Sequence, residues 1–213
     1  MTMINQTETI VLASRNKGKI REINQILKSV LPGIEIKGLD EFPEIGDIPE
    51  TGSTFEENAL IKARMVFENT GYAAIADDSG LVVPALGGAP GVYSARYSGE
   101  KATDQQNNDK LLSEMRHLQG AERRAAFVCV MAAISSDGRE LLVRGEWPGV
   151  IAYEPAGDEG FGYDPLFFDP EAQLCSAQMN PEQKNIRSHR GKALAGLAAK
   201  WKDFISGKLA CCP

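Results

Sequence analysis

The sequence predicts an α/β fold built around a mixed β-sheet, and three observations carry this prediction. Short apolar runs typical of buried strands alternate with segments whose apolar residues recur at helical spacing. A turn sequence, Ser136-Asp-Gly-Arg139, lies between two further apolar runs and is a strong β-hairpin signal. Because helices alternate with strands early and a hairpin lies in the middle, the sheet is expected to be mixed.

The first elements follow from hydrophobic spacing and from residues that stop helices. The apolar run Thr9–Ala13 is expected to be a buried strand. From Ile20 onward the apolar residues have helical spacing, and Pro32-Gly33 is expected to end this helix. A short strand is expected over residues 34–37.

The second helix has clear signals at both ends. Thr54 and Glu57 have the spacing of a capping box, which predicts that a helix opens there. The apolar residues that follow keep helical spacing until Asn69-Thr-Gly71, where the helix is expected to end.

The strand expected at Ala73–Ala76 runs directly into two adjacent carboxylates, Asp77 and Asp78, which Ser79 and Gly80 follow. Buried like charges repel each other and resist desolvation, so they need a cation, a proton or hydrogen-bond donors. A divalent metal ion would satisfy both. Taken alone, the four residues favour a strand-ending turn in which Gly80 adopts a positive φ.

The second half of the chain supplies the hairpin and the last helix. A long segment rich in glycine and proline, residues 81–100, precedes them, and a structureless loop of this length in a compact domain is either functional or contains elements that the pattern misses. The elements expected after it are a helix at 103–118, strands at 124–135 and 140–146, a short strand after Trp147-Pro-Gly149, a glycine- and aromatic-rich segment at 157–169, and a helix at 188–205.

Length, charge and cysteine content limit the possible classes. At 213 residues the chain suits one domain or two closely joined lobes, and its net charge of −6 argues against binding to a nucleic-acid polymer. No apolar stretch approaches the length of a bilayer span and the N-terminus lacks signal-peptide features, so no membrane role and a cytoplasmic location are expected. Cys129 is expected to be a core thiol, and Cys211-Cys212 an exposed pair prone to oxidation.

Two predicted helix starts carry basic residues where acidic ones would be favourable. The first is the stretch Ser14-Arg15-Asn16-Lys17-Gly18-Lys19, in which Ser14 or Asn16 can cap the helix. The second is the start of the last helix at Ser188, around which lie Lys184, Arg187, His189, Arg190 and Lys192. Positive charge at a helix N-terminus is repulsive unless an anion binds there. Either patch alone would be a solvated surface, but two in an acidic chain indicate a bound polyanion.

Further side chains complete a plausible nucleotide site. Phe161-Gly162-Tyr163-Asp164-Pro165 combines ring faces that could stack on a nucleobase with a carboxylate, although a buried aromatic turn is an equal alternative. Glu50 offers a third carboxylate or is an exposed loop acid. Lys62 could reach phosphate or simply extend along the surface. Together these groups fit a nucleoside polyphosphate with magnesium.

Several motifs closely resemble the inosine-triphosphate pyrophosphatase family, whose members act on ITP, dITP and XTP. The resemblance spans nearly the whole chain in family order. Its motifs are Ser14-Arg-Asn-Lys-Gly-Lys19, Glu50-Thr-Gly-Ser-Thr-Phe55, Asn58-Ala-Leu-Ile-Lys-Ala-Arg64, Ala76-Asp-Asp-Ser-Gly-Leu81, Gly87-Gly-Ala-Pro-Gly-Val-Tyr-Ser-Ala-Arg96, Trp147-Pro-Gly149, Gly160-Phe-Gly-Tyr-Asp-Pro165 and Ser188-His-Arg-Gly-Lys192. One departure is Arg15, where many relatives have a small residue.

The resemblance implies a fold and an activity. The expected fold is one elongated two-lobed α/β domain over residues 1–213, with a twisted mixed sheet, a nucleotide cleft between the lobes and a homodimeric assembly. The expected reaction hydrolyses dITP, ITP and XTP to the monophosphate and pyrophosphate, which keeps deaminated purines out of nucleic acids.

The resemblance also implies roles for individual residues. Asp78 is expected to accept a proton from the attacking water and to contact Mg²⁺, which Glu50 and Asp77 help to hold. The phosphate-binding positions are Ser14, Arg15, Asn16, Lys17, Gly18, Lys19, Lys62, Ser79 and Lys184. The base-recognition positions are Phe161, Gly162, Tyr163, Asp164, His189 and Arg190.

Two other functions remain open from the sequence. One is a related pyrophosphatase for other modified or pyrimidine nucleotides, and the other is a non-catalytic sensor that binds a triphosphate. The carboxylates discriminate between enzyme and sensor, because binding needs only phosphate-binding cations whereas hydrolysis needs a base such as Asp78. An RNA-binding module is a poorer third alternative because the chain is acidic.

Overall fold

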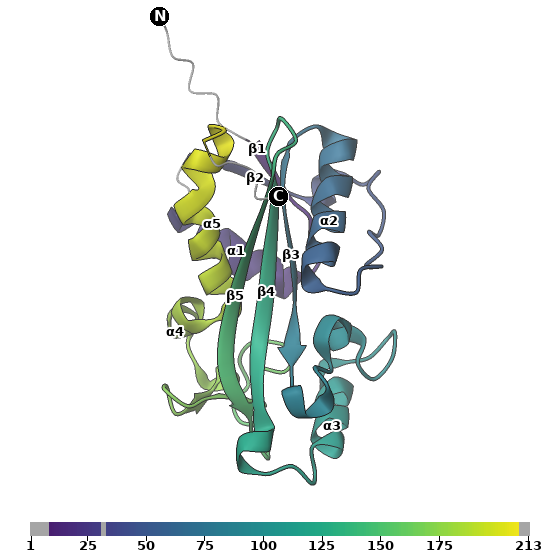
Figure 1. Ribbon diagram of the computed structural model, residues 1–213, viewed down its shortest axis with the longest axis vertical. Coiled ribbons are helices and arrows are strands. Elements are labelled where there is room, and N and C mark those ends of the chain that lie inside the picture. Colours follow the sequence, from purple (N-terminus) through teal and green to yellow (C-terminus); the bar gives the residue numbers. More distant parts are fainter. Residues whose placement is uncertain (1–8, 31–32, 209–213) are drawn as a thin grey trace, which may run out of the picture. The chain divides into compact units, whose positions relative to one another are not determined.

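The computed structural model describes residues 9–30 and 33–208, so Cys211-Cys212, the residues before Thr9 and the expected stop at Pro32 lie outside the described residues (Figure 1). The strands are β1 (Thr9–Leu12), β2 (Glu35–Gly38), β3 (Ala73–Val82), β4 (Arg124–Ile134), β5 (Glu140–Ile151), β6 (Phe167–Asp169) and β7 (Leu174–Cys175). The α-helices are α1 (Lys17–Val30), α2 (Phe55–Thr70), α3 (Asp104–Glu114), α4 (Pro181–Arg187) and α5 (His189–Ile205). Short 3-10 helices occupy Leu39–Glu41, Pro84–Leu86, Gly91–Arg96, Gly120–Arg123 and Ser176–Gln178.

All seven strands form one sheet in the order β2-β1-β3-β4-β5-β6-β7. β1 is parallel to both β2 and β3, whereas β6 is antiparallel to β5 and β7. The predicted α/β fold with a mixed sheet is therefore confirmed. The burial patterns agree with strand positions: β4 is almost continuously buried, as expected for a central strand, and β5 alternates between buried and more exposed residues.

The contacts divide the chain into two compact units. The first contains the described residues up to Asp78 together with 130–143 and those from Ala193 onward, and the second contains 79–129 and 144–192. Each unit is therefore assembled from segments that are distant in the sequence. The boundary on β3 falls between Asp78 and Ser79, so the two aspartates belong to the first unit and the serine to the second.

In the first unit, α2 and α5 flank the strands on opposite sides (Figure 1). The predicted capping box opens α2, with Thr54 accepting from the Glu57 N–H, and Gly71 ends the helix in the left-handed conformation. α5 packs closely on β5, since a Cβ at Gly196 would lie 2.7 Å from Cγ1 of Val143. The buried residues that hold the helices to the strands include Val11, Ile23, Leu27, Ala59, Ala63, Val66, Ile75, Leu194, Leu197 and Trp201.

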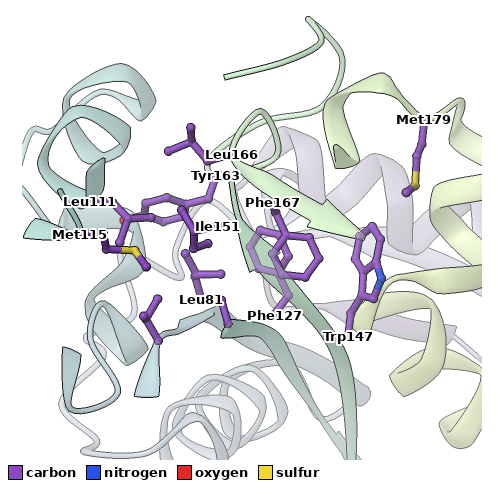
Figure 2. Packing of buried hydrophobic residues seen from close by; sticks show 12 residues of the cluster. Leu81, Leu111, Met115, Phe127, Trp147, Ile151, Tyr163, Leu166, Phe167 and Met179 are labelled. Carbon is purple, nitrogen blue, oxygen red and sulfur yellow. The ribbon is translucent and has the colours of Figure 1, made fainter. Parts of the chain in front are cut away.

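The second unit has a core rich in aromatic rings (Figure 2). The rings of Phe127, Trp147 and Phe167 all pack against one another, with the Phe167 centroid 4.5 Å from that of Phe127 and 4.9 Å from that of Trp147. Leu111 from α3 and Met115, the C-cap residue of that helix, pack in the same cluster beside Tyr163. This core fixes β6 and the segments on either side of it, which carry several of the predicted site residues.

The sequence prediction was wrong at the end of β3. The strand does not turn at Asp77-Asp78 but continues to Val82, and Gly80 is a buried strand residue without a positive φ. The two carboxylates stay inside a regular strand because each has a cationic partner, described below. β5 likewise continues through Trp147-Pro-Gly149, where two strands had been expected.

Other elements were shorter than expected or were not anticipated. α3 ends at Glu114, although a helix to residue 118 was expected, and β6, β7 and α4 had no clear signal because each has only seven residues or fewer. The predicted core thiol at Cys129 is confirmed, since its side chain is fully buried. Among the described residues, no helix combines the length and apolar character that crossing a membrane requires.

Candidate active site

The two aspartates of β3 are buried charges with separate cationic partners. Their relative exposures are 1% for Asp77 and 4% for Asp78. Because successive side chains of a strand point to opposite faces, neighbouring aspartates must find partners on different sides of the sheet. Lys19 of α1 lies 3.0 Å from Oδ2 of Asp77, and Lys62 of α2 lies 3.0 Å from Oδ1 of Asp78. As a result, each aspartate pairs with a lysine from a different helix.

Lys62 is shared between two carboxylates. Its Nζ lies 2.8 Å from Oε1 of Glu50 as well as 3.0 Å from Asp78. The side chain is buried, so it neither extends along the surface nor reaches solvent freely. Glu50 is therefore a member of the cluster and not an isolated loop acid.

Asn58 supports this cluster and was not singled out as a site residue by sequence reasoning. It lies one helical turn before Lys62 on α2, so both side chains project from the same face. Its Nδ2 donates to Oδ2 of Asp78 at 3.3 Å, and its Oδ1 accepts from the Gly52 N–H at 2.7 Å. Asn58 is fully buried. The amide thus fastens the segment that carries Glu50 to the carboxylate of Asp78. The sequence alone carries no signal for this role, because the burial of Asn58 and its partners are set by the tertiary structure.

Burial and neighbouring charges set the protonation of this cluster. Burial raises the pKa of Asp78, against the opposing effects of Lys62 and Lys19. Burial alone would lower the pKa of Lys62, but Asp78, Asp77 and Glu50 outweigh it and raise that pKa, so the ammonium stays charged. Three carboxylates face two ammonium groups, which leaves a formal charge of −1 (3 negative, 2 positive). A carboxylate with a raised pKa beside an ammonium group is a suitable proton acceptor.

The basic stretch before α1 divides into several roles. Asn16 caps the helix, since its Oδ1 accepts from the Lys19 N–H at 3.1 Å, while Oγ of Ser14 accepts from the Asn16 N–H at 3.3 Å. The first turn contains no acidic residue and includes Gly18, as the sequence indicated. Lys17 is exposed.

Arg15 has its partners outside the carboxylate cluster. Its guanidinium donates to the carbonyl of Ile45 and lies 3.8 Å from Asp47. This arginine therefore ties the start of α1 to the loop that precedes Glu50.

In the second unit, Asp164 organises the glycine-aromatic loop. Its buried carboxylate accepts from the Phe161 N–H at 2.8 Å, from Oγ of Ser176 at 2.7 Å and from Nζ of Lys184 at 2.7 Å. Three donors on one carboxylate use most of its capacity. Asp164 thus fixes the loop, and it holds Lys184 of α4 against it.

The two rings of this loop have different environments. Tyr163 lies in the hydrophobic core and its hydroxyl donates to the Ser94 carbonyl at 2.9 Å (Figure 2). Phe161 is partly exposed, with Nζ of Lys184 at 5.0 Å and Cζ of Arg190 at 5.8 Å from its ring centroid. Only Phe161 is placed to offer a ring face to a ligand, and Tyr163 anchors the loop beneath it.

Gly162 lies between the rings and is tied to α3. Its N–H donates to Oδ2 of Asp104 at 2.7 Å, and its carbonyl accepts from Nδ2 of Asn108 at 3.0 Å. Its positive φ of 63° is a conformation that favours glycine.

The start of α5 brings its polar side chains into the interior of the second unit. Ser188 caps the helix as predicted, with Oγ accepting from the Gly191 N–H at 3.0 Å. His189 stacks on Phe127 with 4.8 Å between centroids. Arg190 is only 2% exposed, and its Nη2 donates to Oγ of Ser79 at 3.1 Å. Of the predicted basic patch, Lys184, His189 and Arg190 are therefore buried, whereas Arg187 is half-buried and Lys192 is exposed.

A second buried aspartate anchors α4 and was also missed. Oδ2 of Asp169 accepts from Nε1 of Trp147 at 3.0 Å and from Nη1 of Arg187 at 3.1 Å. Its Oδ1 accepts from the N–H groups of Glu171 and Ala172 at 2.8 and 3.1 Å. Arg187 is the last residue of α4, so this carboxylate holds the helix that carries Lys184.

No three or more His, Cys, Asp or Glu side chains form a metal-binding group within residues 9–30 and 33–208. The donors of Glu50, Asp77 and Asp78 are carboxylate oxygens, the ligands that a hard cation such as Mg²⁺ prefers. With a formal charge of −1 after pairing with Lys19 and Lys62, the cluster still favours a cation. Glu50 and Asp78, which share Lys62, therefore supply a carboxylate pair of the kind that magnesium binds together with substrate phosphates.

Comparison with known proteins identifies the family of this chain. The model of the Ham1 family matches residues 10–200. The dITP/XTP pyrophosphatase of Nitratidesulfovibrio vulgaris is 53% identical over 205 residues, which cover 93% of this chain and 98% of that protein. The Geobacter sulfurreducens protein of the same name is 53% identical over 87% of this chain and 92% of its own length.

Solved structures agree with these sequence matches. The Staphylococcus aureus Ham1 protein superposes with a TM-score of 0.83 at 42% identity, covering 92% of this chain and 98% of that one. A HAM1 protein from Coxiella burnetii gives 0.82 at 44% identity, with coverages of 92% and 99%. The resemblance predicted from the motifs is confirmed.

Replacing Asn58 with alanine tests its supporting role. Asn58→Ala leaves the half-buried Gly52 N–H without its acceptor and removes a donor from the buried Asp78, so we expect a loss of about 1–3 kcal/mol in unfolding free energy. Urea denaturation measures this loss. The matched control is Asn69→Ala, an exposed asparagine near the end of the same helix, which should change stability by less than about 0.5 kcal/mol. Equal effects of the two substitutions would contradict the role of Asn58.

Asp169 should make stability depend on pH. Burial by itself would raise its pKa, but the N–H donors of Ala172, Trp147 and Glu171 and the charge of Arg187 lower it overall. A lowered pKa in the folded state stabilises the protein above the unfolded pKa of about 3.9, and this contribution disappears as the pH falls through the folded value.

The variant Asp169→Asn should therefore lose about 1–3 kcal/mol near pH 7, with a difference from the unaltered protein that shrinks below about pH 4. Urea denaturation at several pH values measures it. Glu171→Gln, which alters the exposed second partner of Arg187, should be nearly neutral. A pH-independent loss for Asp169→Asn would show that its charge is not what matters.

Proposed function

The chain belongs to the Ham1 family, and from this premise we propose that it hydrolyses ITP, dITP and XTP to the nucleoside monophosphate and pyrophosphate. The observation that carries the proposal is the buried carboxylate of Asp78, held between Lys62 and Asn58 with a raised pKa. The family members compared above include proteins named dITP/XTP pyrophosphatase. Removal of such deaminated purine nucleotides keeps them out of nucleic acids.

In this proposal the first unit performs the chemistry at the phosphates. Asp78 accepts a proton from the water that attacks the α-phosphorus, while the bond between the α- and β-phosphates breaks. The negative charge that develops on the departing pyrophosphate is stabilised by Lys19, Lys62 and the N-terminus of α1. Ser14, Asn16, Lys17 and Gly18 contribute hydroxyl, amide, ammonium and backbone groups to the same phosphates. Arg15 has a supporting role because it holds the neighbouring loop.

Glu50, Asp77 and Asp78 are the residues that would hold Mg²⁺. When bound, the ion withdraws charge from phosphate oxygens and neutralises the charge that accumulates during the reaction. Asp77 and Asp78 belong to one strand and Glu50 is fixed through Lys62 and the Asn58–Gly52 bond. Glu50 and Asp78 are therefore held close together through Lys62, whereas the side chain of Asp77 projects to the other face of the strand.

The second unit is proposed to recognise the nucleoside and to contribute phosphate contacts. Phe161 offers a ring face to the base, with Lys184 and Arg190 beside it. Arg190 and His189 can donate to a 6-keto oxygen and leave a 6-amino group without a matching acceptor. Ser79 and Lys184 supply phosphate contacts, whereas Gly162, Tyr163 and Asp164 keep the loop in place. The proposal includes, from the family resemblance, a homodimer in the cytoplasm that does not bind nucleic-acid polymers.

A substrate panel tests the proposed activity. ITP, dITP and XTP should release pyrophosphate in the presence of Mg²⁺ far faster than ATP or GTP, because buried donors discriminate strongly against a mismatched exocyclic group. Chromatography of the products distinguishes pyrophosphate from orthophosphate. Release of orthophosphate, or equal rates on ATP, would reject the proposal, and turnover of only pyrimidine or other modified nucleotides would favour the related pyrophosphatase.

The variant Asp78→Asn tests the role of the proposed base. We expect kcat to fall by about 10²–10⁴-fold, since Asn keeps the shape but cannot accept the proton, while nucleotide binding persists. Calorimetry measures binding and single-turnover assays measure the chemical step. The control Asp203→Asn, an exposed aspartate in α5 of the same unit, should keep full activity. Loss of nucleotide binding by a folded Asp78→Asn protein would assign Asp78 a binding role instead, and unchanged turnover would point to a sensor-like or different mechanism.

A further inference from the structure

We propose that Lys62 is an internal counter-cation that competes with the divalent metal ion for Glu50 and Asp78, so that metal binding displaces it toward the phosphates. The inference rests on the proposed function only in taking a divalent cation as the ligand of these carboxylates. It assigns Lys62 a regulatory role beyond binding phosphate: it controls when the carboxylates are available to the metal.

The ammonium group of Lys62 is placed between two acids. Nζ of Lys62 lies between two carboxylates, 2.8 Å from Oε1 of Glu50 and 3.0 Å from Oδ1 of Asp78. Both distances are those of charge-assisted hydrogen bonds. A phosphate-binding lysine held only for its substrate would not need to bridge two acids that are proposed to bind a cation.

The helix that carries Lys62, α2, is held at both ends. α2 is fixed at its N-terminus by the Thr54–Glu57 capping box and ends at Gly71 in the left-handed conformation. Lys62 lies in the middle of this helix, so its backbone position is set by the fold. Its four-carbon stem is the only part that can move, and it can swing the ammonium group without unfolding the helix.

Lys62 and a divalent cation would compete for the same carboxylates, Glu50 and Asp78. The oxygen of Asp78 that faces Lys62 is Oδ1, and Oδ2 already accepts from Asn58. A divalent cation placed on Glu50 and Asp78 would lie close to the ammonium group, and like charges at such distances repel strongly. Binding of the metal therefore costs the Lys62 contacts unless the lysine gains another anion.

The phosphates of a bound nucleotide would receive the displaced ammonium group. A triphosphate supplies anionic oxygens, which a lysine binds as a compact point charge. Metal and nucleotide thus each favour the state that the other needs: the metal releases Lys62, and the phosphates receive it. This reciprocal coupling predicts that metal binds weakly alone and more tightly when a nucleotide is present.

The test measures metal binding without nucleotide. Titration calorimetry of the full chain with Mn²⁺ should give at least about tenfold tighter binding for Lys62→Met than for the unaltered protein, because the cluster then carries three carboxylates and one ammonium. Lys62→Arg, which keeps the charge, should show no such gain. Equal or weaker binding by Lys62→Met, or an equal gain by Lys62→Arg, would overturn the proposal.

The coupling supplies a second arm. A non-hydrolysable ITP analogue should tighten Mn²⁺ binding in the unaltered protein, and this gain should be largely lost in Lys62→Met. An unchanged gain in the variant would overturn the coupling. The metal titrations without nucleotide involve neither ITP nor turnover, so a chain that prefers another nucleotide can still pass them, and a chain active on ITP can fail them.

A measurement on the unaltered protein covers the case in which Lys62→Met does not fold. In a sample labelled with ¹⁵N and ¹³C at lysine, NMR resolves the side-chain Nζ signals of buried lysines, and Lys62 is assigned from the signal missing in Lys62→Arg. Addition of Mg²⁺ without nucleotide should shift this signal and speed its proton exchange as the ion pair opens. A Lys62 signal that stays unchanged at saturating Mg²⁺ would overturn the proposal.

Discussion

The structure depends on how two adjacent buried carboxylates are neutralised. Asp77 and Asp78 are neighbours on β3, so the alternation of the strand sends them to opposite faces of the sheet. Neither charge could remain buried without a cation, and each receives one from a different helix, Lys19 from α1 and Lys62 from α2. This requirement places α1 and α2 around β3 with basic side chains directed inward. The ion pairs that allow the two carboxylates to remain buried also bring acidic and basic side chains together in one site.

The second unit uses the same principle with a different outcome. Asp164 and Asp169 are buried, but their oxygens are engaged by N–H, hydroxyl and cationic donors within their own unit. Their function is to hold α4 and the Phe161 loop, and through them Lys184, in fixed positions. Carboxylates with filled hydrogen-bonding capacity act as fasteners, whereas Asp78, whose pKa burial raises, is suited to accept a proton. Comparison of donors around each acid thus separates supporting groups from reactive ones.

Much of the fold could be predicted from sequence because its signals are local. The capping box at Thr54, the hairpin turn at Ser136–Arg139 and the Ser188 cap each depend on a few adjacent residues, and the structure contains all three. The continuation of β3 through Asp77-Asp78 could not be predicted in this way, because the stabilising lysines lie on helices far away in the sequence. Asn58 and Asp169 were missed for the same reason. The motif residues were recognised, but which of them pair with one another is information that only the tertiary structure holds.

The pairing also explains why so many oppositely charged groups are concentrated in one place. A site built only from carboxylates would repel itself and resist burial, and one built only from lysines would bind phosphate without a proton acceptor. Interleaving Glu50, Lys62 and Asp78 lets each group remain charged in the interior. The residual charge of −1 is small enough for the fold to tolerate, yet it still favours a further cation. Since the internal ammonium is a movable side chain, the cluster can change its partners without any change in the backbone that supports it.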